Sequence, residues 1–201
     1  MMLRRALLFL PGSLLPAAAI AAPGPARFRV LRDGKEIGTH QVRLSGNTAK
    51  LSVQTEIALQ VKLAGFTVFR LRHDIAEEWA GDRLQRLPSR HDRNGTVTEA
   101  RVTAEGGALV AQGPEGEARL PANAAPLTWW NGANFARPLI RPLTGKPLSA
   151  TPSRSALPGG GVQFTLNAEV ESIARYDADG RWVGFSTKGD DGSAVVYELM
   201  V

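Results

Sequence analysis

The sequence contains no cysteine, and only 6% of its 201 residues are aromatic. Without cysteine the fold uses no disulfide, and no cysteine is present to carry the lipid of a usual bacterial lipoprotein. The domain must therefore be stabilised by apolar burial and sheet hydrogen bonds. Beyond residue 21 the chain also lacks convincing helical periodicity over ten residues, and it has no uninterrupted apolar run long enough for a membrane-spanning helix.

The first 21 residues have the pattern of a secretory signal peptide. Arg4 and Arg5 form a positive start, an apolar run extends to Leu15, and Ala19-Ile20-Ala21 has the small-x-small pattern of a cleavage site. The apolar run is broken by proline and glycine, so it is too short to remain as a membrane span. We expect cleavage at about Ala21, a periplasmic or secreted protein, and a single β domain over residues 22–201.

The charge of the chain excludes nucleic acid as a partner. The formal net charge is +5, and two of the arginines are expected to leave with the signal peptide. The remaining arginines alternate with apolar or acidic residues and form no basic block. A nucleic-acid surface needs denser clustering, so we interpret these arginines as a solvated, mildly basic face.

Alternation with a period of two dominates the chain after residue 21. Between residues 51 and 63 the odd positions are apolar apart from Thr55, and the even positions are polar apart from Ala58. This pattern predicts a half-buried antiparallel strand about 40 Å long, which must coil or bend. Similar alternation recurs over residues 162–176 and 195–201.

Turn signals separate the alternating runs at regular intervals. They are Asp33-Gly34, Gly81-Asp82, Asn94-Gly95, Gly106-Gly107, Asp179-Gly180 and Asp191-Gly192. Such pairs are typical of tight hairpins, so consecutive strands should pair with their neighbours. The sequence predicts an all-β fold: a strongly curved antiparallel meander sheet or open half-barrel of about ten strands.

A proline-rich region interrupts this pattern between residues 121 and 158, where seven of the thirteen prolines lie. Proline cannot donate to a sheet ladder, so this region should be mainly loop or edge strand. Residues 127–131 are compatible with a short helical turn. A long ordered loop that carries Trp129 and Trp130 must bury them somewhere.

The ordered series of short motifs resembles a family of exported bacterial proteins known as domain of unknown function 6134. The motifs are Phe28-Arg29-Val30, Asp33-Gly34-Lys35-Glu36-Ile37-Gly38-Thr39-His40, Val61-Lys62, His73, Glu78-Trp79, Gly81, Leu84, Leu87, Asn94-Gly95, Trp130, Thr144-Gly145, Tyr176-Asp177, Gly180-Arg181-Trp182-Val183, Asp191-Gly192-Ser193 and Tyr197. The resemblance covers nearly all of the chain after residue 21. It implies the fold and export, and it implies no reaction, because the family has no assigned activity.

The chain departs from this family at Asp82, where a cysteine often follows the glycine, so no role of a family cysteine carries over. At the level of fold alone, such curved sheets look like the half-barrel clams of envelope lipid and lipoprotein carriers.

His73 and Glu77 share the parity of Phe69, Ile75 and Trp79, and so lie on an otherwise apolar strand face. Buried polar groups need partners. One interpretation places both residues in a pocket, as an acid–base pair or as ligand anchors. The other is structural: the end of the strand reaches solvent, or the two side chains hydrogen-bond to each other.

The four tryptophans Trp79, Trp129, Trp130 and Trp182 either line an apolar cleft or interface, or fill the wide interior of a curved sheet. His40, His73, His91, Asp74 and Asp92 lack the close spacing of a known metal motif, and no Gly-x-Ser-x-Gly elbow is present. The sequence therefore predicts no metal, no cofactor and no assigned catalytic residue.

These patterns favour a non-enzymatic module that binds an apolar small molecule or lipid, or an envelope protein partner, in a concave face with the Trp129-Trp130 loop over its mouth. Two alternatives stay open. One is a hydrolase or isomerase that uses His73 with Glu77 or Glu78. The other is a small outer-membrane β-barrel, because alternation alone does not tell an apolar interior from an apolar exterior.

Overall fold

Strands dominate the computed structural model, which describes residues 23–200. Thirteen of them form one antiparallel sheet in the order β12-β13-β14-β15-β16-β1-β2-β3-β4-β5-β6-β7-β8. These strands are β1 (Ala26–Arg32), β2 (Lys35–Gly46), β3 (Lys50–Leu63), β4 (Phe66–Ala80), β5 (Arg83–Arg93), β6 (Thr96–Glu105), β7 (Ala108–Gly113), β8 (Gly116–Pro121), β12 (Ser153–Ala156), β13 (Val162–Asn167), β14 (Glu171–Tyr176), β15 (Trp182–Lys188) and β16 (Ala194–Leu199).

The expected all-β, strongly curved meander is confirmed, and the sheet is not closed into a barrel. The count of thirteen strands exceeds the expected ten or so, because β7, β8 and β12 are too short to show long alternating runs. The predicted signal peptide lies outside the described residues.

Residues 122–148, hereafter the strap, connect β8 to the last five strands of the main sheet. The strap contains three two-residue strands and one short 3₁₀ helix, namely β9 (Ala125–Pro126), η1 (Gly132–Ala136), β10 (Leu139–Ile140) and β11 (Pro147–Leu148). These strands form a separate sheet in which β10 is parallel to β9 and antiparallel to β11. The helical turn begins at Gly132 and not within residues 127–131. A second 3₁₀ turn, η2 (Pro158–Gly160), precedes β13.

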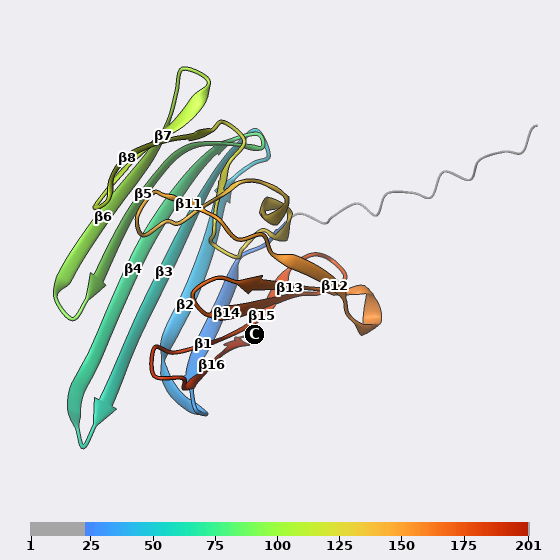
Figure 1. Ribbon diagram of the computed structural model, residues 1–201. Helices are drawn as coiled ribbons and strands as arrows, with labels where there is room; N and C mark the ends of the chain where they lie inside the picture. Colours follow the sequence, from blue (N-terminus) through green and yellow to red (C-terminus); the bar gives the residue numbers. More distant parts are fainter. Residues whose placement is uncertain (1–22, 201) are drawn as a thin grey trace, which may run out of the picture.

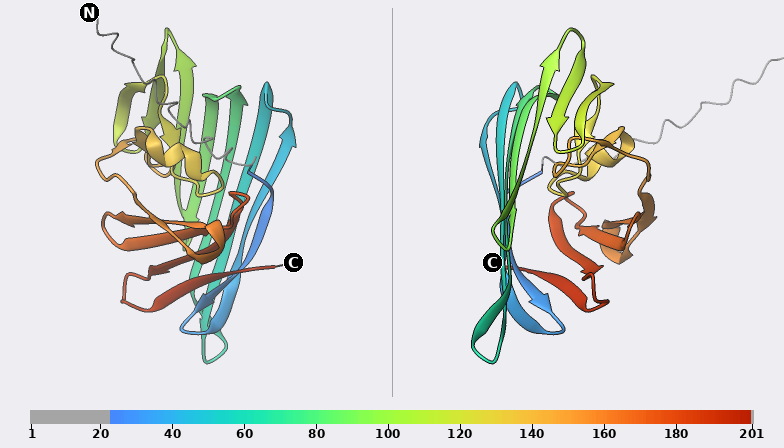
Figure 2. Two further views of the ribbon diagram at one scale, coloured as in Figure 1. Left: turned by 90° about the vertical axis from the view of Figure 1, so that its right-hand side faces the viewer. Right: turned by 60° about the vertical axis from the view of Figure 1, so that its left-hand side comes forward.

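The main sheet forms two facing walls. Figure 2 shows strands β2–β8, which include the longest strands of the sheet, on one side and strands β13–β16 on the other, with the strap between them at the open side. Strand β1 joins the walls, because it pairs with β16 along one edge and with β2 along the other (Figure 1). The core lies between the walls and the strap.

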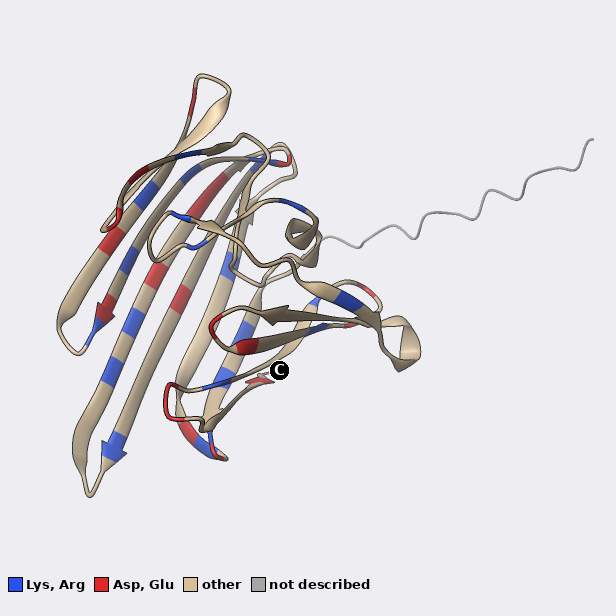
Figure 3. Cartoon of the chain, in the orientation of Figure 1, with Lys and Arg blue, Asp and Glu red and all other residues tan. Residues whose placement is uncertain are grey.

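The alternation places the apolar side chains inside the fold. Val53 and Ile75 are buried on the concave face, whereas Glu56 and Asp74 lie on the outer face with other charged residues. Figure 3 shows charged residues spread along the long strands. An outer face of this kind does not match the apolar outer band of a membrane barrel. Among residues 23–200, no helix is long and apolar enough to cross a bilayer.

Gly38 allows β2 and β3 to approach closely. Its φ is +151°, and a Cβ at this position would lie 1.9 Å from the carbonyl oxygen of Ala58 on β3. Because that oxygen belongs to the backbone of a paired strand, the contact cannot be relieved by turning a side chain.

We therefore expect Gly38→Ala to lower the free energy of unfolding by about 3 kcal/mol or more. Gly34→Ala is the matched control. Gly34 also has a positive φ, but no atom lies within 4 Å of its would-be Cβ, so a loss of about 1 kcal/mol is expected. Urea denaturation of both variants measures the difference, and equal losses would contradict the close approach of β2 and β3.

Candidate functional site

The fully buried carboxylate of Glu77 on β4 connects the main sheet to the strap. Its Oε2 accepts a hydrogen bond of 2.9 Å from the Trp79 indole, and its two oxygens lie 3.0 and 3.1 Å from the Trp130 indole nitrogen. Thr128 of the strap also hydrogen-bonds to this carboxyl group. Burial raises the pKa of Glu77 to about 7, and these three hydrogen bonds act in the opposite direction.

Trp129 contacts the opposite wall. Its ring packs against Phe185 of β15 and Phe135 of η1, with centroid distances of 4.9 and 5.4 Å. The Tyr176 hydroxyl on β14 donates a hydrogen bond of 2.5 Å to the Trp129 carbonyl oxygen. Trp129 has a φ of +63°, an uncommon conformation for a bulky residue. The two adjacent tryptophans of the strap thus contact opposite walls.

Hydrogen bonds and an ion pair connect other parts of the strap to the sheet. Arg137 binds Asp82 in the β4–β5 turn through its backbone carbonyl and its carboxylate. Further along, Lys146 donates to the Glu117 carbonyl oxygen at 3.2 Å. The strap also comes so close to β7 that a Cβ on Gly113 would lie 2.2 Å from the Thr144 carbonyl oxygen.

A cavity of about 520 Å³ lies beneath the strap on the concave face. The sheet supplies one side of it from β2, β3 and β4. The strap and the β13–β14 hairpin supply the others. Its apolar lining residues are Ile57, Ile75, Leu127, Trp129, Pro142, Leu143, Leu148, Leu166, Ala168, Val170 and Tyr197. At its rim Arg141 and Glu169 form an ion pair of 3.1 Å.

The wall of this cavity contains buried polar atoms without a protein partner. They are both ring nitrogens of His40 on β2 and the hydroxyl of Thr55 on β3, and among the described residues they are the only such side-chain atoms. The His40 ring lies edge-on to Trp182 and Tyr197, with centroids 5.0 and 5.4 Å away. Burial, aided by the nearby His73, lowers the pKa of His40 to about 3, so the imidazole is neutral at pH 7.

All three histidines of the chain lie along one row of the concave face. The cross-strand register joins His40 to Ile57, Ile57 to His73, and His73 to His91. His73 Nε2 lies 2.9 Å from the Ser89 hydroxyl, and burial with the neighbouring His91 lowers the pKa of His73 to about 4. Within residues 23–200 no three histidine or acidic side chains lie close enough to hold a metal ion.

The structure brings three of the six predicted site residues together and places the other three apart. Glu77, Trp79 and Trp130 meet beneath the strap, and Trp129 packs on the opposite wall. Trp182 lies beside His40, with its indole donating to the Gly184 carbonyl oxygen.

His73 and Glu77 do not pair with each other. His73 contacts Ser89 and lines the cavity, whereas the carboxylate of Glu77 is occupied by the indoles. Sequence reasoning did not single out His40 and Thr55 as a site. One sequence pattern could have pointed to His40: it shares the parity of Val42 and Leu44, so it lies on an apolar strand face.

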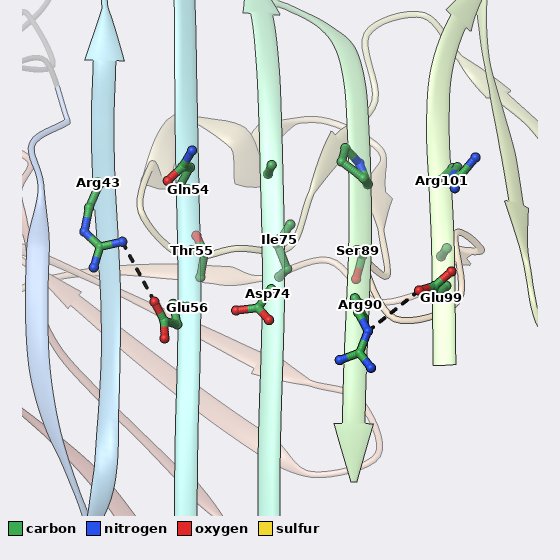
Figure 4. A pocket seen from close by; sticks show the side chains of 13 residues that line it. Arg43, Gln54, Thr55, Glu56, Asp74, Ile75, Ser89, Arg90, Glu99 and Arg101 are labelled. Carbon is green, nitrogen blue, oxygen red and sulfur yellow. Dashed lines mark ion pairs between the residues drawn. The ribbon is translucent and has the colours of Figure 1, made fainter. Parts of the chain in front are cut away.

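A shallower hollow of about 310 Å³ lies on the outer face of β2–β6 (Figure 4). Charged side chains cross it, including the ion pairs Arg43–Glu56 and Arg90–Glu99 at 3.8 Å each. Exposed pairs of this kind contribute little to stability, and they lie on a solvated face of the sheet. The concave cavity is therefore the candidate site.

Comparisons with known proteins agree with this architecture. The family described as "Domain of unknown function (DUF6134)" matches residues 28–200. The structure resembles that of a β-barrel-like protein of domain of unknown function DUF1849 from Brucella abortus, with a TM-score of 0.62, 9% identity, and coverage of 89% of this chain and 96% of that one.

A second similar structure is a DUF1089 family protein from Pseudomonas aeruginosa, with a TM-score of 0.44, 12% identity, and coverage of 89% and 95% of the two chains. No curated protein matches the chain.

The buried carboxyl group predicts a pH dependence of stability. Between pH 4.5, the ordinary pKa, and about 7, folded Glu77 holds a proton that the unfolded chain has released. The free energy of unfolding that Glu77 contributes therefore falls as the pH rises through this window, by up to about 3 kcal/mol.

Glu77→Gln removes this titration while keeping an acceptor for the indoles. In urea denaturation, the free energy of unfolding of the variant minus that of the wild type should rise from pH 4.5 to 7. Above pH 7 this difference should be constant. The titrating histidines are present in both proteins and cancel in the difference. Glu78→Gln, at an exposed neighbour on the outer face, should give a flat difference. A flat difference for Glu77→Gln would contradict a raised pKa.

Proposed function

Because the chain belongs to the family of domain of unknown function DUF6134, whose description names no activity, we propose a function from the geometry of the cavity. The protein binds a small apolar molecule that carries one neutral polar group. The apolar body occupies the concave cavity beneath the strap. The polar group meets His40 and Thr55.

The observation that carries this proposal is the pair of unsatisfied residues in the cavity wall. A buried polar group without a partner costs about 1–3 kcal/mol, and native proteins rarely leave one. Here two such residues occur together, both lining the same cavity. The unsatisfied atoms themselves have almost no accessible surface, so a ligand with hydrogen-bonding capacity would supply their missing partners once a small shift of the lining side chains exposes them.

The surroundings of these atoms define the chemical class of the ligand. Neutral imidazole offers one donor and one acceptor, and the threonine hydroxyl can act as either. They therefore suit a hydroxyl, ester or amide group better than a full charge. The apolar lining suits an aliphatic or ring body, and about 520 Å³ lies in the usual range of small-molecule sites.

Binding is favoured over catalysis by the position of His73. It approaches Ser89 in the way that a general base approaches a nucleophile, yet no carboxylate among the described residues orients it by a hydrogen bond. With a pKa of about 4, it is also a weak base at neutral pH. Of the two carboxylates expected as its partner, Glu77 is held by Trp79 and Trp130, and Glu78 is exposed and forms an ion pair with Arg86.

We further propose that binding takes place after export, in the periplasm or outside the cell. This rests on the signal-peptide pattern of residues 1–21. Fractionation of the expressing cells tests it: the processed chain should appear in the periplasmic or culture fraction. Retention of the unprocessed chain in the cytoplasm would contradict it.

Native mass spectrometry of the protein purified without detergent tests the ligand directly. We expect a stoichiometric adduct, and organic extraction should release an apolar molecule with a single neutral polar group. If only the empty protein is found, even after exposure to a total lipid extract, the proposal fails.

Thr55→Val separates a binding role from a structural one. Without ligand, the variant should be about 1–2 kcal/mol more stable than wild type, because an unsatisfied hydroxyl is removed. Its dissociation constant for the ligand should rise about tenfold, because one hydrogen bond between neutral groups is lost.

Thr187→Val is the matched control for this variant, because the Thr187 hydroxyl donates to the Glu171 carbonyl oxygen at 2.9 Å. The control should lose stability and retain the ligand. An unchanged dissociation constant for the ligand in Thr55→Val would contradict the proposed contact.

A further inference from the structure

The β3–β4 hairpin projects beyond the rest of the sheet (Figure 1). Pairing of β2 with β3 stops at Leu59, and pairing of β5 with β4 stops at Leu71. The segment between these two positions, residues 60–70, is called the hairpin tip below. Within the tip the two strands pair with each other around the turn at Ala64 and Gly65, and at its base the backbone of Arg70 also hydrogen-bonds to Asn94.

The hairpin tip carries the most exposed large apolar side chains of the described residues. Phe66 is 77% exposed, Leu63 is 69% exposed and Val68 is 54% exposed. Leu63 and Phe66 are direct cross-strand partners, so their side chains lie together at the end of the hairpin. An apolar cluster on a projecting element contributes nothing to the core and is typical of a contact surface.

The charged residues within the hairpin tip, Lys62 and Arg70, are both positive. From residue 57 to residue 73 the sequence has no acidic residue, and it contains Lys62, Arg70 and Arg72. Arg72 is paired with Glu56 and Asp74. Within the described part of the chain Lys62 and Arg70 form no ion pair, and both are exposed.

An open groove of about 1040 Å³ runs beside the base of the hairpin tip, toward the β1–β2 turn. Basic side chains outnumber acidic ones along it. Its charged lining residues include Lys35, Lys62, Arg70 and Arg72 against Asp33 and Glu36.

We propose that the hairpin tip docks the protein onto the surface of an anionic lipid bilayer. Phe66 and Leu63 enter the boundary between headgroups and acyl chains, while Lys62 and Arg70 contact anionic headgroups. Apolar side chains flanked by lysine and arginine are the combination that favours this interface. A hydrophilic partner would leave the apolar cluster uncovered, and the bilayer surface matches both the cluster and its charge.

An apolar path connects the docking surface to the cavity. From the cavity wall at Ile57 and His73, the same face of the hairpin continues through the cross-strand pairs Leu59–Leu71 and Val61–Phe69 to the tip. These four side chains are half-buried. The guanidinium of Arg93, which is ion-paired with Asp190, lies over the Phe69 ring beside them. Docking at the tip therefore places the cavity at the end of a surface along which an apolar molecule can move to and from the bilayer.

Co-sedimentation with vesicles tests the docking, whatever the outcome of the ligand experiment. The purified protein is mixed with vesicles of phosphatidylcholine alone, or of phosphatidylcholine and phosphatidylglycerol in equal parts. We expect binding to the anionic vesicles and weaker binding to the neutral ones. The double variant Leu63→Ser/Phe66→Ser should lower the partition coefficient by at least about tenfold on anionic vesicles.

Two further variants separate the apolar and electrostatic parts. Lys62→Gln/Arg70→Gln should weaken binding to the anionic vesicles on the order of tenfold, with little change on neutral ones. Val196→Ser/Leu199→Ser removes two exposed apolar side chains from β16, outside the hairpin tip, and should bind like wild type. In addition, the emission of Phe66→Trp should shift to the blue when anionic vesicles are added.

Two results would overturn the proposal. One is equal binding by the wild type and the Leu63→Ser/Phe66→Ser variant. The other is binding to no vesicle. If the wild type then self-associates and the tip variant is monomeric, the hairpin tip is a contact between copies of the chain.

Discussion

The hydrogen bonds between one buried carboxylate and two indoles hold this structure in its open form. Glu77 lies on the long wall of the sheet, and Trp130 lies on the strap, 53 positions later in the chain. Because the neighbouring Trp129 packs against the other wall, one dipeptide links β4 to β15 across the interior. This link acts together with the apolar side chains of the strap, among them Phe135, Leu139 and Ile140, which are buried in the core.

Locally unfavourable features gather around this cavity. Glu77 is buried with a raised pKa, Trp129 has a positive φ, and His40 and Thr55 lack partners among protein atoms. Each such feature costs on the order of 1–3 kcal/mol, and it persists only where the surrounding structure holds it. Here the thirteen-stranded sheet and its apolar core provide that support. Strain concentrated at one place in an otherwise regular fold is typical of a functional site.

Local patterns predicted much of the fold, and long-range contacts explain what they missed. Alternation predicted residues 51–63 as a strand, and β3 spans Lys50–Leu63, because one face of this strand is buried or half-buried over most of its length. Shared parity suggests a partnership between His73 and Glu77, but four residues along a strand are about 13 Å apart, too far for direct contact. The actual partner, Trp130, depends on the path of the strap. That path follows from packing between the walls, which no local pattern describes.

The open sheet requires that something other than backbone pairing connect its two ends. A closed barrel would pair β8 with β12, and the ladder between them would seal the concave face. Both end strands are instead short, with six and four residues, and β8 ends at Pro121, which limits edge-to-edge association. The strap replaces the missing ladder with side-chain contacts. These contacts include buried apolar side chains as well as hydrogen bonds, so the strap holds the two walls at a defined distance.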